Sequence, residues 1–551
     1  MRHRISRRLF LLSGLLTGCG IHRPIPSTQQ DPTPIAPFKN TQNPSRSSIR
    51  LTEVTEQAGI HFSLGHGGRS PLTILETAGG GCAFLDYDAD GWSDILLVGP
   101  YNLALYRNRR DGTFEDVTAQ SGLDPHRYWM GCAVGDYDGD GLPDVFLSGY
   151  HCYALYHNEG KGRFREVTAE SGIEGLDWSM SAAFADFTGS GRLDLFIGQY
   201  VLFNRDTPQI CTVGRAHSAC GPEIYQPLSG HLFLNVDGRR FRAIPWKDTG
   251  KTWGALASRL LDGPHPDLYL ANDMMPGDLW TNQEGHWRNV GVLTGTAYDA
   301  QGNLQGGMGV DSADYDNDGC LDLIVTTYFA QPASLYHNDG NGLFHVVSSL
   351  CGIGPPTMPY VNFGTAFVDF DNDGWLDLIL TNGHVRDNVH SFDAAQTYAQ
   401  PVQVFHNQNA YFTEISQECG VGNLRLVGRG LTIGDYDHDG RQDVLICNLE
   451  GRSVLLRNVS EAHHWLEVVL SQPGMNRAAL GAMVTLEAPS LRRIAEIRTS
   501  GSVLSAREPI AHFGLGDYSG PVTLHIRWPD GKTQHNSIER VDRRVTIVRS
   551  V

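Results

Sequence analysis

The feature that most constrains the fold is a nine-residue acidic pattern, D-x-D-x-D-G-x-x-D, which occurs five times. The copy from Asp136 to Asp144 has carboxylates at positions 1, 3, 5 and 9 and glycine at position 6. Alternate carboxylates followed by a glycine turn can wrap oxygen ligands round one hard cation, as the first half of an EF-hand loop does. Position 12, where an EF-hand has glutamate, is the apolar Leu147, and the flanks resemble short strands. We therefore predict calcium-binding loops within β-hairpins.

The five copies share one frame, and each follows a strand rich in glycine and alanine. A single copy would also fit a solvated turn, because Asp and Gly are favoured there, but five copies favour metal binding. A backbone carbonyl is expected to add a ligand at the seventh position of each loop. The predicted calcium ligands are Asp86, Asp88, Asp90, Asp94, Asp136, Asp138, Asp140, Asp144, Asp314, Asp316, Asp318, Asp322, Asp369, Asp371, Asp373, Asp377, Asp435, Asp437, Asp439 and Asp443.

Two further stretches are altered copies of the pattern. In residues 186–194 two of the four carboxylates are replaced by hydroxyls, which lowers the ligand charge and predicts a weak metal site. Its candidate ligands are Asp186, Thr188, Ser190 and Asp194. Residues 260–266 have lost the alternate acids although they precede a strand-like segment, so no calcium is expected there.

A second repeated marker ends in asparagine and occurs seven times, at Asn108, Asn158, Asn235, Asn282, Asn338, Asn407 and Asn458. Seven units of roughly fifty residues, each with about four short strands, are typical of a β-propeller. The last unit lacks its final strand, whereas residues 51–56 supply a surplus one. We predict an all-β fold in which residues 49–460 form a seven-bladed propeller and the N-terminal strand completes the last blade.

The C-terminal region, residues 461–551, has alternating apolar runs separated by Gly and Pro turns, which favours a small β-sandwich-like domain. From residue 463 it carries 11 Lys and Arg against 8 Asp and Glu, whereas the whole chain has a net charge of -18. This balance suggests that a mildly basic domain docks on an acidic ring. The overall charge argues against nucleic acid as the main partner, because phosphate binding needs an excess of Lys and Arg.

Residues 1–19 have the pattern of a lipoprotein signal peptide. Four arginines precede an apolar run, residues 9–16, that is too short for a permanent membrane helix. The run ends in a segment that resembles a lipobox, with Cys19 as the lipidated residue; an unlipidated secreted protein is the alternative. The paired arginines fit a twin-arginine signal and an ordinary basic region almost equally. Residues 20–48, rich in Pro, Ser, Thr and Gln, read as a tether, so we expect a membrane-anchored protein of the cell envelope.

Two cysteines and four polar residues are further candidates. Cys211 and Cys220 lie in an insertion, residues 203–229, and in an exported protein their spacing favours a disulfide over a metal site. Asn272, Asp273, Asn382 and His384 follow the second strand of their units, where loops can converge on one face of the ring. They are predicted to face a ligand, although Asn and Asp also serve simply to shape tight turns.

These motifs together resemble known families. The repeats are similar to FG-GAP/VCBS repeats, also found in integrin α-subunit propellers. The C-terminal segments around Asn476–Ala482, His512–Gly516 and Trp528–Gly531 resemble the ASPIC/UnbV domain. With the segment from Ala271 to Pro276 they make the mature chain similar to the cartilage acidic protein family. The resemblance implies a calcium-binding extracytoplasmic propeller and no agreed reaction.

The sequence therefore predicts a membrane-tethered, calcium-binding scaffold for a protein or glycan ligand. No catalytic residue is predicted, because we find no G-x-S-x-G, H-E-x-x-H, phosphate-loop or C-x-x-C-H motif. One alternative is an exported enzyme with its active site in the propeller's central channel. A lesser alternative is nucleic-acid binding through the C-terminal domain.

Overall fold

The computed structural model describes residues 48–550, apart from 69, 262 and 462. Nearly every element in this part of the chain is a β-strand, which confirms the all-β fold class. The predicted signal peptide with Cys19, and the tether up to residue 47, lie outside the described residues. No helix within the described range has the length and apolar character needed to span a membrane. The helices are α1 (Thr118–Ser121), α2 (Thr168–Ser171), α3 (Gly291–Thr294), α4 (Gly354–Thr357), η1 (Pro222–Ile224) and η2 (Val389–Ser391).

Seven antiparallel sheets, each built on four neighbouring strands, make up most of the fold, and we call these sets of four strands blades 1 to 7. Strands β39 (Ser500–Gly501) and β40 (Ser505–Ala506) extend the sheet of blade 1, and β21 (Gln305–Gly306) extends that of blade 4. The strands of each blade are given from inner to outer. Blades 1 to 3 are, in turn, β3 (Gly81–Leu85), β4 (Asp94–Gly99), β5 (Asn102–Asn108), β6 (Phe114–Asp116) in blade 1; β7 (Trp129–Gly135), β8 (Asp144–Gly149), β9 (Tyr153–Asn158), β10 (Phe164–Glu166) in blade 2; and β11 (Ser179–Ala185), β12 (Asp194–Gln199), β15 (His231–Asn235), β16 (Phe241–Ala243) in blade 3. Blades 4 to 7 are β17 (Thr252–Ser258), β18 (Asp267–Met275), β19 (Asp278–Gln283), β20 (His286–Asn289) in blade 4; β22 (Val310–Ala313), β23 (Asp322–Val325), β24 (Ser334–Asn338), β25 (Phe344–Val346) in blade 5; β26 (Asn362–Val368), β27 (Asp377–Asn382), β29 (Gln403–Gln408), β30 (Tyr411–Glu414) in blade 6; and β32 (Gly428–Gly434), β33 (Asp443–Asn448), β35 (Val454–Asn458), β1 (Leu51–Glu53) in blade 7.

The blades form a closed ring. The inner strand of each blade lies beside the inner strand of the next, and β32 of blade 7 returns to β3 of blade 1. An inner strand such as β7 is buried along its whole length because neighbouring blades cover both of its faces. Apolar side chains fill the space between adjacent blades, as where Ile324 and Leu335 of blade 5 meet Phe367 and Phe405 of blade 6.

The N-terminal strand closes the ring as the sequence predicts. Strand β1 pairs with β35 as the outer strand of blade 7, with Leu51 opposite Asn458. Shorter pairs join loops: β2 (Ser63–Leu64) with β34 (Gly451–Arg452), β13 (Ile210–Val213) with β14 (Ala216–Ala219), β21 (Gln305–Gly306) with β18, and β28 (Gln400–Pro401) with β31 (Arg425–Leu426).

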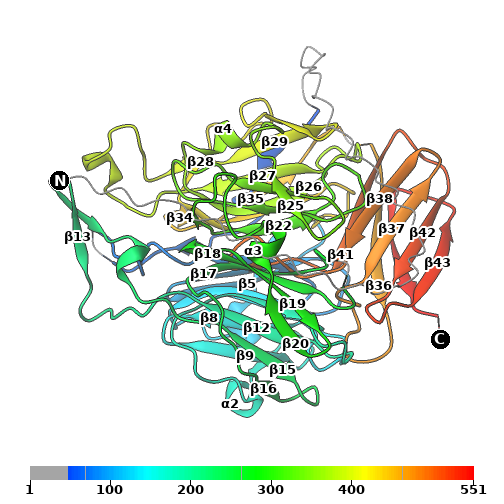
Figure 1. Ribbon diagram of the computed structural model, residues 1–551. Helices are drawn as coiled ribbons and strands as arrows, with labels where there is room; N and C mark the ends of the chain where they lie inside the picture. The colour runs from blue at the N-terminus through cyan, green and yellow to red at the C-terminus, as the bar shows by residue number, and fades with distance from the viewer. Residues whose placement is uncertain (1–47, 69, 262, 462, 551) are drawn as a thin grey trace, which may run out of the picture. The chain divides into compact units, whose positions relative to one another are not determined.

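The C-terminal region forms two sheets around a shared apolar core that includes Leu466, Leu524 and Trp528. One sheet has the order β41-β36-β44 and the other the order β38-β37-β42-β43. Figure 1 draws these strands in orange and red. They are β36 (His464–Ser471), β37 (Met483–Ala488), β38 (Leu491–Glu496), β41 (Ile510–Gly516), β42 (Val522–Arg527), β43 (Thr533–Ile538) and β44 (Arg543–Val548). The short strands β39 (Ser500–Gly501) and β40 (Ser505–Ala506) lie between β38 and β41 in the chain.

Residues 498–507, which we call the plug, leave the C-terminal sheets and enter the ring. The plug contacts the inner strands of all seven blades. Ala83 of β3 pairs with Ala506, and the hydrogen bonds to the other six strands are Cys132 N to Leu504 O, Leu504 N to Ser181 Oγ, Ala257 N to Ser500 Oγ, Val310 N to Ser502 O, Thr365 N to Ser502 Oγ and Thr432 Oγ1 to Ala506 O, at 2.8–3.2 Å.

The plug occupies the central channel, where the alternative prediction places an active site. Val503 and Leu504 at its tip are fully buried. A cavity of about 530 Å³ lies beside Thr499 and Arg507, whereas the cavity between residues 501–507 and the inner strands of blades 6 and 7 measures about 10 Å³. That volume is about the space needed for one water molecule. Part of the C-terminal region therefore lies inside the ring, in addition to the predicted docking of this region on it.

Candidate functional site

The five acidic loops each join the inner strand of a blade to its second strand, in blades 1, 2, 5, 6 and 7. The carboxylate at position 1 shapes the loop from within. In blade 1, Asp86 Oδ1 accepts a hydrogen bond from Asp90 N at 2.9 Å and its Oδ2 accepts one from Gly91 N at 2.8 Å. Gly91 has a φ of 89°, a left-handed conformation that favours glycine. The sequence therefore builds a turn that gathers its own carboxylates.

The aspartate at position 9 braces the loop. Asp94 is fully buried, and its two oxygens accept hydrogen bonds from Tyr87 N at 3.1 Å and Asn108 N at 2.7 Å. Burial raises the pKa of Asp94 to about 9, with further contributions from neighbouring carboxylates. This residue therefore fixes the strand ends as well as facing the acidic cluster, a role that spacing alone does not reveal.

Several carboxylate oxygens in the loops point toward the cluster without a hydrogen-bond partner among the described residues. They are Oδ1 of Asp88, Asp314, Asp371 and Asp437. Asp314 and Asp371 are each only 3% exposed. Since buried polar atoms are nearly always satisfied, such oxygens indicate room for a bound cation. The loops thus contain acidic clusters that could hold a metal ion.

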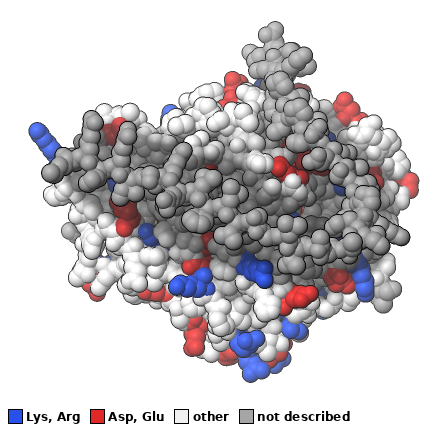
Figure 2. Space-filling view, in the orientation of Figure 1, with Lys and Arg blue, Asp and Glu red and all other residues white. Residues whose placement is uncertain are grey.

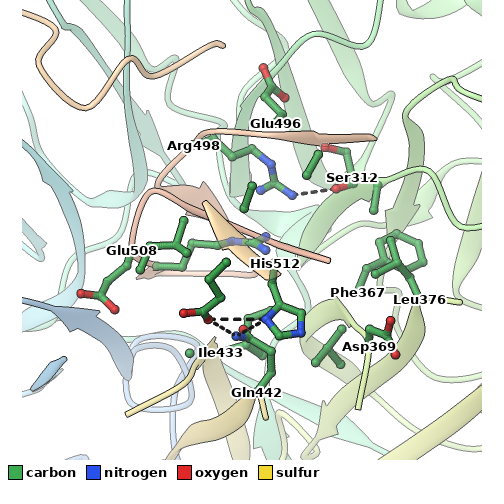
Figure 3. A pocket seen from close by; sticks show the side chains of 18 of the residues that line it. Ser312, Phe367, Asp369, Leu376, Ile433, Gln442, Glu496, Arg498, Glu508 and His512 are labelled. Carbon is green, nitrogen blue, oxygen red and sulfur yellow. Dashed lines mark hydrogen bonds and ion pairs between the residues drawn. The ribbon is translucent and has the colours of Figure 1, made fainter. Parts of the chain in front are cut away.

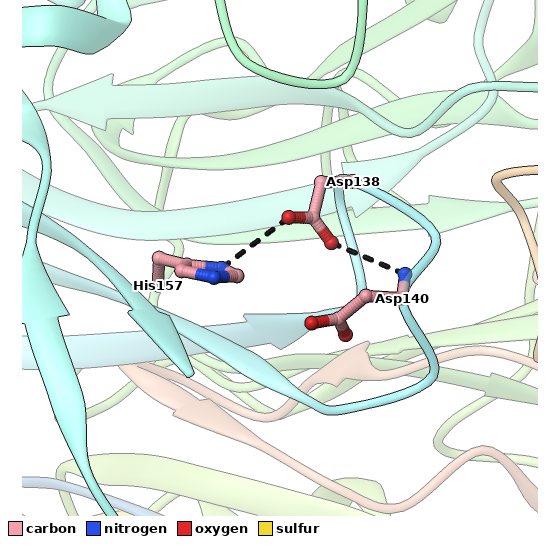
Figure 4. A group of neighbouring side chains, drawn as sticks. All are labelled: Asp138, Asp140 and His157. Atoms are coloured by element: carbon pink, nitrogen blue, oxygen red, sulfur yellow. Dashed lines mark hydrogen bonds and ion pairs between the residues drawn. The ribbon is translucent and has the colours of Figure 1, made fainter. Parts of the chain in front are cut away.

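A basic side chain faces each intact loop, a feature that the sequence analysis missed. In blade 2, His157 Nδ1 lies 3.3 Å from Asp138 Oδ2 (Figure 4). The same nitrogen lies 3.2 Å from Asp144 Oδ1. Hydrogen bonding to Asp144 raises the pKa of His157. The residue directly before the marker asparagine supplies this group in every intact blade: Arg107, His157, His337, His406 and Arg457. The two blades with altered loops have Leu234 and Thr281 at that position, so the basic group accompanies a full set of carboxylates.

The altered loops keep many of their internal hydrogen bonds, although Asp267 Oδ1 in blade 4 has no partner among the described residues. Asp186 accepts hydrogen bonds from Ser190 N at 2.9 Å and Gly191 N at 2.8 Å, while Thr188 Oγ1 donates to Asp194 Oδ2 at 3.1 Å. In blade 4, Leu261 N donates to Asp267 Oδ2 at 2.8 Å, so the position-9 brace survives without the other acids. These loops therefore keep their shape with fewer carboxylates.

The marker asparagine joins each blade to its neighbour. Asn158 N donates to Asp144 Oδ1 at 2.8 Å in its own blade, and Asn158 Nδ2 donates to Tyr87 O at 2.8 Å, at position 2 of the neighbouring loop. We call this contact the latch. It occurs in all seven blades, as Asn108 to Tyr436, Asn158 to Tyr87, Asn235 to Tyr137, Asn282 to Phe187, Asn338 to Leu260, Asn407 to Tyr315 and Asn458 to Phe370.

Replacing one latch residue should destabilise the ring. Asn158→Ala leaves Tyr87 O and Gly160 N without their buried partner, at an expected cost of about 1–3 kcal/mol in the free energy of unfolding. Urea denaturation followed by circular dichroism measures this loss. Asn303→Ala, in an exposed loop, is the matched control. Equal unfolding midpoints for the two variants would contradict the latch.

The C-terminal sheets dock on the face that carries the loops. His512 Nε2 lies 2.7 Å from Asn372 Oδ1 in the blade 6 loop, and Arg477 Nε donates to Gly139 O in the blade 2 loop. Beside His512 is a cavity of about 120 Å³ with charged walls, including Asp369, Glu496 and Glu508 (Figure 3). Among the described residues, the C-terminal sheets therefore cover loops of blades 2 and 6 on this face.

The opposite face carries the insertion, because the connections of an antiparallel blade alternate between its two ends. Strands β13 and β14 of the insertion stand at the far side of Figure 1 from the C-terminal strands. The structure joins Cys211 and Cys220 in a disulfide, as the sequence predicts. A cavity of about 230 Å³ opens beside it, lined by Tyr200, Trp253 and Asp273 among others. We call it the open-face cavity.

The four predicted ligand-facing residues have different surroundings. Asp273 lines the open-face cavity. Asn272 is buried and donates to Pro276 O at 2.9 Å, and Asn382 is buried and donates to Pro401 O at 2.8 Å, so both shape the chain instead. His384 is 2% exposed, and burial lowers its pKa to about 4. Of the four residues only Asp273 lines this cavity, and a ligand-facing role for it stays a prediction.

Family models match three stretches described as "FG-GAP-like repeat", residues 86–147, 136–197 and 314–380, and one described as "ASPIC and UnbV", residues 472–551. The chain is 26% identical to mouse cartilage acidic protein 1 over 258 residues, 38% of this chain and 39% of that protein. It is 26% identical to the human protein over 347 residues, 54% of this chain and 51% of that protein. The chain thus spans about half or less of the length of these curated relatives. These matches confirm the resemblance found in the sequence.

Solved structures with a related arrangement include a lectin of Agrocybe aegerita that recognises non-reducing terminal N-acetylglucosamine. It has 16% identity and a TM-score of 0.38, and the match covers 68% of this chain and 86% of the lectin. Another is YCF48 from Cyanidioschyzon merolae, with 10% identity and a TM-score of 0.38, covering 72% and 97% of the two chains.

Proposed function

We propose that this protein is a calcium-stabilised β-propeller that serves as a binding scaffold in the cell envelope, tethered to a membrane through Cys19. The observation that carries the calcium proposal is the set of buried carboxylate oxygens in the loops that lack a partner among the described residues, such as Asp371 Oδ1. A buried carboxylate without a compensating partner is costly. A hard cation would supply that partner in the loops of blades 1, 5, 6 and 7, where these oxygens lie.

The donor set fits calcium better than its common competitors. Carboxylate oxygens at positions 1, 3 and 5 of a flexible turn suit Ca²⁺, which accepts 6–8 oxygen ligands in irregular geometry, whereas Mg²⁺ demands a near-octahedral site. His157, His337 and His406 add an imidazole near three loops, so a transition metal in those loops is the rival outcome. Bound calcium would neutralise the clustered carboxylates of each loop.

The protein's own residues would carry the effect of a filled loop to the rest of the ring. Position 9 ties the loop to its blade, and the residue at position 2 accepts the latch hydrogen bond from the next blade. The C-terminal sheets rest on the same loops through contacts such as His512 to Asn372. A loop held in one shape therefore supports two neighbouring blades and the docked C-terminal region, which keeps the opposite face in a fixed form.

The number of bound ions tests this proposal. Metal analysis of the purified protein by mass spectrometry is expected to give about five calcium ions, one for each intact loop. Asp371→Asn should lower the count by about one, because it removes the position-3 carboxylate of the blade 6 loop. Asp206→Asn, at an exposed position outside the loops, is the control and should leave the count unchanged. Absence of calcium from the wild-type protein, or a different metal in its place, would contradict the proposal.

A protein or glycan is the proposed class of ligand, bound on the face opposite the loops. The insertion and the open-face cavity on that side support this placement. On the part of the surface coloured in Figure 2, basic and acidic side chains are interspersed. A surface of mixed charge suits these ligands better than nucleic acid, which requires a basic patch.

A further inference from the structure

The open-face cavity has the construction of a preformed site. Its aromatic walls include Tyr200, Trp253 and Tyr328, and Asp273 contributes a carboxylate. Beneath it, Trp253 belongs to the apolar cluster that contains Val503 and Leu504 at the tip of the plug. The volume of about 230 Å³ lies below the ~300–1,000 Å³ typical of sites for drug-sized ligands, so a single small ring is the appropriate scale.

The rim of the cavity is held in place by covalent and polar contacts. The Cys211–Cys220 disulfide ties the insertion strand that supplies one wall. Lys251 Nζ donates a hydrogen bond to Pro222 O at 2.8 Å, and Ser218 Oγ donates one to Asn388 Oδ1 at 2.8 Å. A rim fixed in this way loses little conformational freedom when a ligand enters.

Three polar groups meet inside the cavity, and one of them lacks a partner. Tyr200 Oη donates to Asp273 Oδ2 at 2.6 Å. Burial raises the pKa of Asp273 to about 6, and the Tyr200 hydrogen bond, Lys251 and the nearby Trp253 indole N–H offset part of this rise. Across the described chain no acceptor meets the hydrogen-bond geometry of that indole N–H. Trp253 is only 3% exposed, so this donor is withdrawn from bulk water. An unsatisfied buried donor beside a carboxylate acceptor calls for a group that can accept one hydrogen bond and donate another.

The charges near the cavity exclude two simpler ligands. Asp273 and Glu223 are balanced by Lys251 and Arg386. An organic cation would satisfy the carboxylate but leave the Trp253 donor unpaired and face two basic groups. An anion would meet Asp273 directly. A hydroxyl group on a neutral molecule satisfies both the donor and the acceptor, and its carbon framework can pack on the aromatic walls.

We propose that the open-face cavity binds a neutral hydroxylated ring of the size of one sugar unit, with a ligand hydroxyl placed between the Trp253 indole and the Asp273 carboxylate. This inference deepens the proposed scaffold function and rests on it for its biological role. The ligand class is a single sugar ring, which both a free sugar and the terminal unit of a glycan can present.

Saturation-transfer NMR on the calcium-supplemented full-length mature protein tests the proposal. The probes are the methyl glycosides of glucose, galactose, mannose and N-acetylglucosamine, which present hydroxyls in different orientations, together with tetramethylammonium as the organic cation. At least one glycoside should give transfer signals and tetramethylammonium none. Absence of signal from every glycoside, or binding of the cation alone, would overturn the proposal. A glycan carrying the same terminal sugar is then compared with the free glycoside, and the stronger transfer signal distinguishes the two sources.

Paired variants localise the binding. Trp253→Phe keeps the aromatic wall and removes the N–H, so the affinity for the glycoside should fall roughly two- to tenfold, the loss of one hydrogen bond. Trp178→Phe is the matched control, because Trp178 is also buried with an unpartnered indole N–H among the described residues but does not line the cavity. Equal affinities for the two variants would place the sugar elsewhere and overturn the proposal.

Failure of this inference can be told apart from failure of the scaffold proposal. The metal count and its response to Asp371→Asn do not depend on any sugar, and the glycoside signals do not depend on the identity of the metal. A calcium-loaded protein without glycoside binding would reject only the ligand class. Glycoside binding by a protein that contains no calcium would reject only the metal proposal.

Discussion

Chelation of calcium is expected to lower the melting temperature of the purified protein by on the order of 10 °C. Each independent site stabilises the folded state by roughly 2.7 kcal/mol at a hundredfold excess of ion over the dissociation constant, so five sites give roughly 13 kcal/mol. A cooperative unit of about 500 residues has an unfolding entropy of about 1 kcal/mol per kelvin, which converts that sum into the shift. Differential scanning calorimetry in excess calcium and after dialysis against EGTA measures it.

The physical reason lies in the emptied loops. Burial raises the pKa of Asp136 to about 7, and proximity to Asp144 and other carboxylates adds to the rise. Burial and the neighbouring Glu467 raise the pKa of Asp435 to about 8. Without a cation, these groups must either bind protons or remain charged side by side at neutral pH. The metal-free fold therefore bears a cost that calcium removes.

This cost gives the chelated protein a distinctive pH dependence. A carboxyl group whose pKa is higher in the folded than in the unfolded state stabilises the fold at low pH and loses that contribution as the pH rises through the folded value. Between about pH 4 and pH 7 the EGTA-treated protein should therefore become less stable as pH rises, because unfolded aspartate titrates near 3.9. The calcium-loaded protein should not show this decline, since the ion holds the loops ionised. Identical melting curves with and without EGTA would contradict the proposed calcium loops, and magnesium in place of calcium controls for ionic strength.

The acidic loops, the blades and the ring closure were predictable because each rests on local spacing in the sequence. The D-x-D-x-D-G-x-x-D pattern specifies a turn within nine residues, and the missing last strand after Asn458 has its counterpart at Leu51. The latch was visible only as a repeated asparagine. Its role depends on a carbonyl in another blade, which no local pattern identifies. The basic residue before that asparagine could have been found by comparing blades with intact and altered loops.

The plug was not predictable, because its partners are spread over the whole ring. Residues 499–506 include Ser500, Gly501, Ser502 and Ser505, which resemble an ordinary loop. Small hydroxylated residues are needed there because the seven inner strands leave little space and offer backbone groups to bond. The flanking Arg498 and Arg507 were the available signal, since two arginines beside a short apolar pair are unusual in a simple turn. The open-face cavity depends similarly on an insertion meeting loops from other blades.

Asp311→Asn is expected to destabilise the protein by about 3–5 kcal/mol, because it removes the anion that holds the plug in the channel. Asp311 is fully buried, and its Oδ1 accepts a hydrogen bond from Arg498 Nη2 at 2.6 Å and another from Arg507. Its Oδ2 accepts one from Phe367 N at 2.9 Å in the next blade. Burial and the nearby Arg498 lower the pKa of Arg507 to about 10. Both guanidiniums therefore need this carboxylate as their counter-charge. Without it, two largely buried cations would face each other.

A surface pair provides the matched control for this change. Asp237 binds Arg240 at 2.8 Å in an exposed turn, so Asp237→Asn should cost at most about 1 kcal/mol. Urea unfolding compares the two variants, and limited trypsin digestion distinguishes release of the plug from global unfolding, because Arg498 and Arg507 become accessible only when the plug leaves the ring. Adding Arg498→Met to Asp311→Asn should recover part of the lost stability, since it removes one of the unpaired cations. If Asp311→Asn were as stable and as protease-resistant as Asp237→Asn, the plug would not be held by this charge cluster.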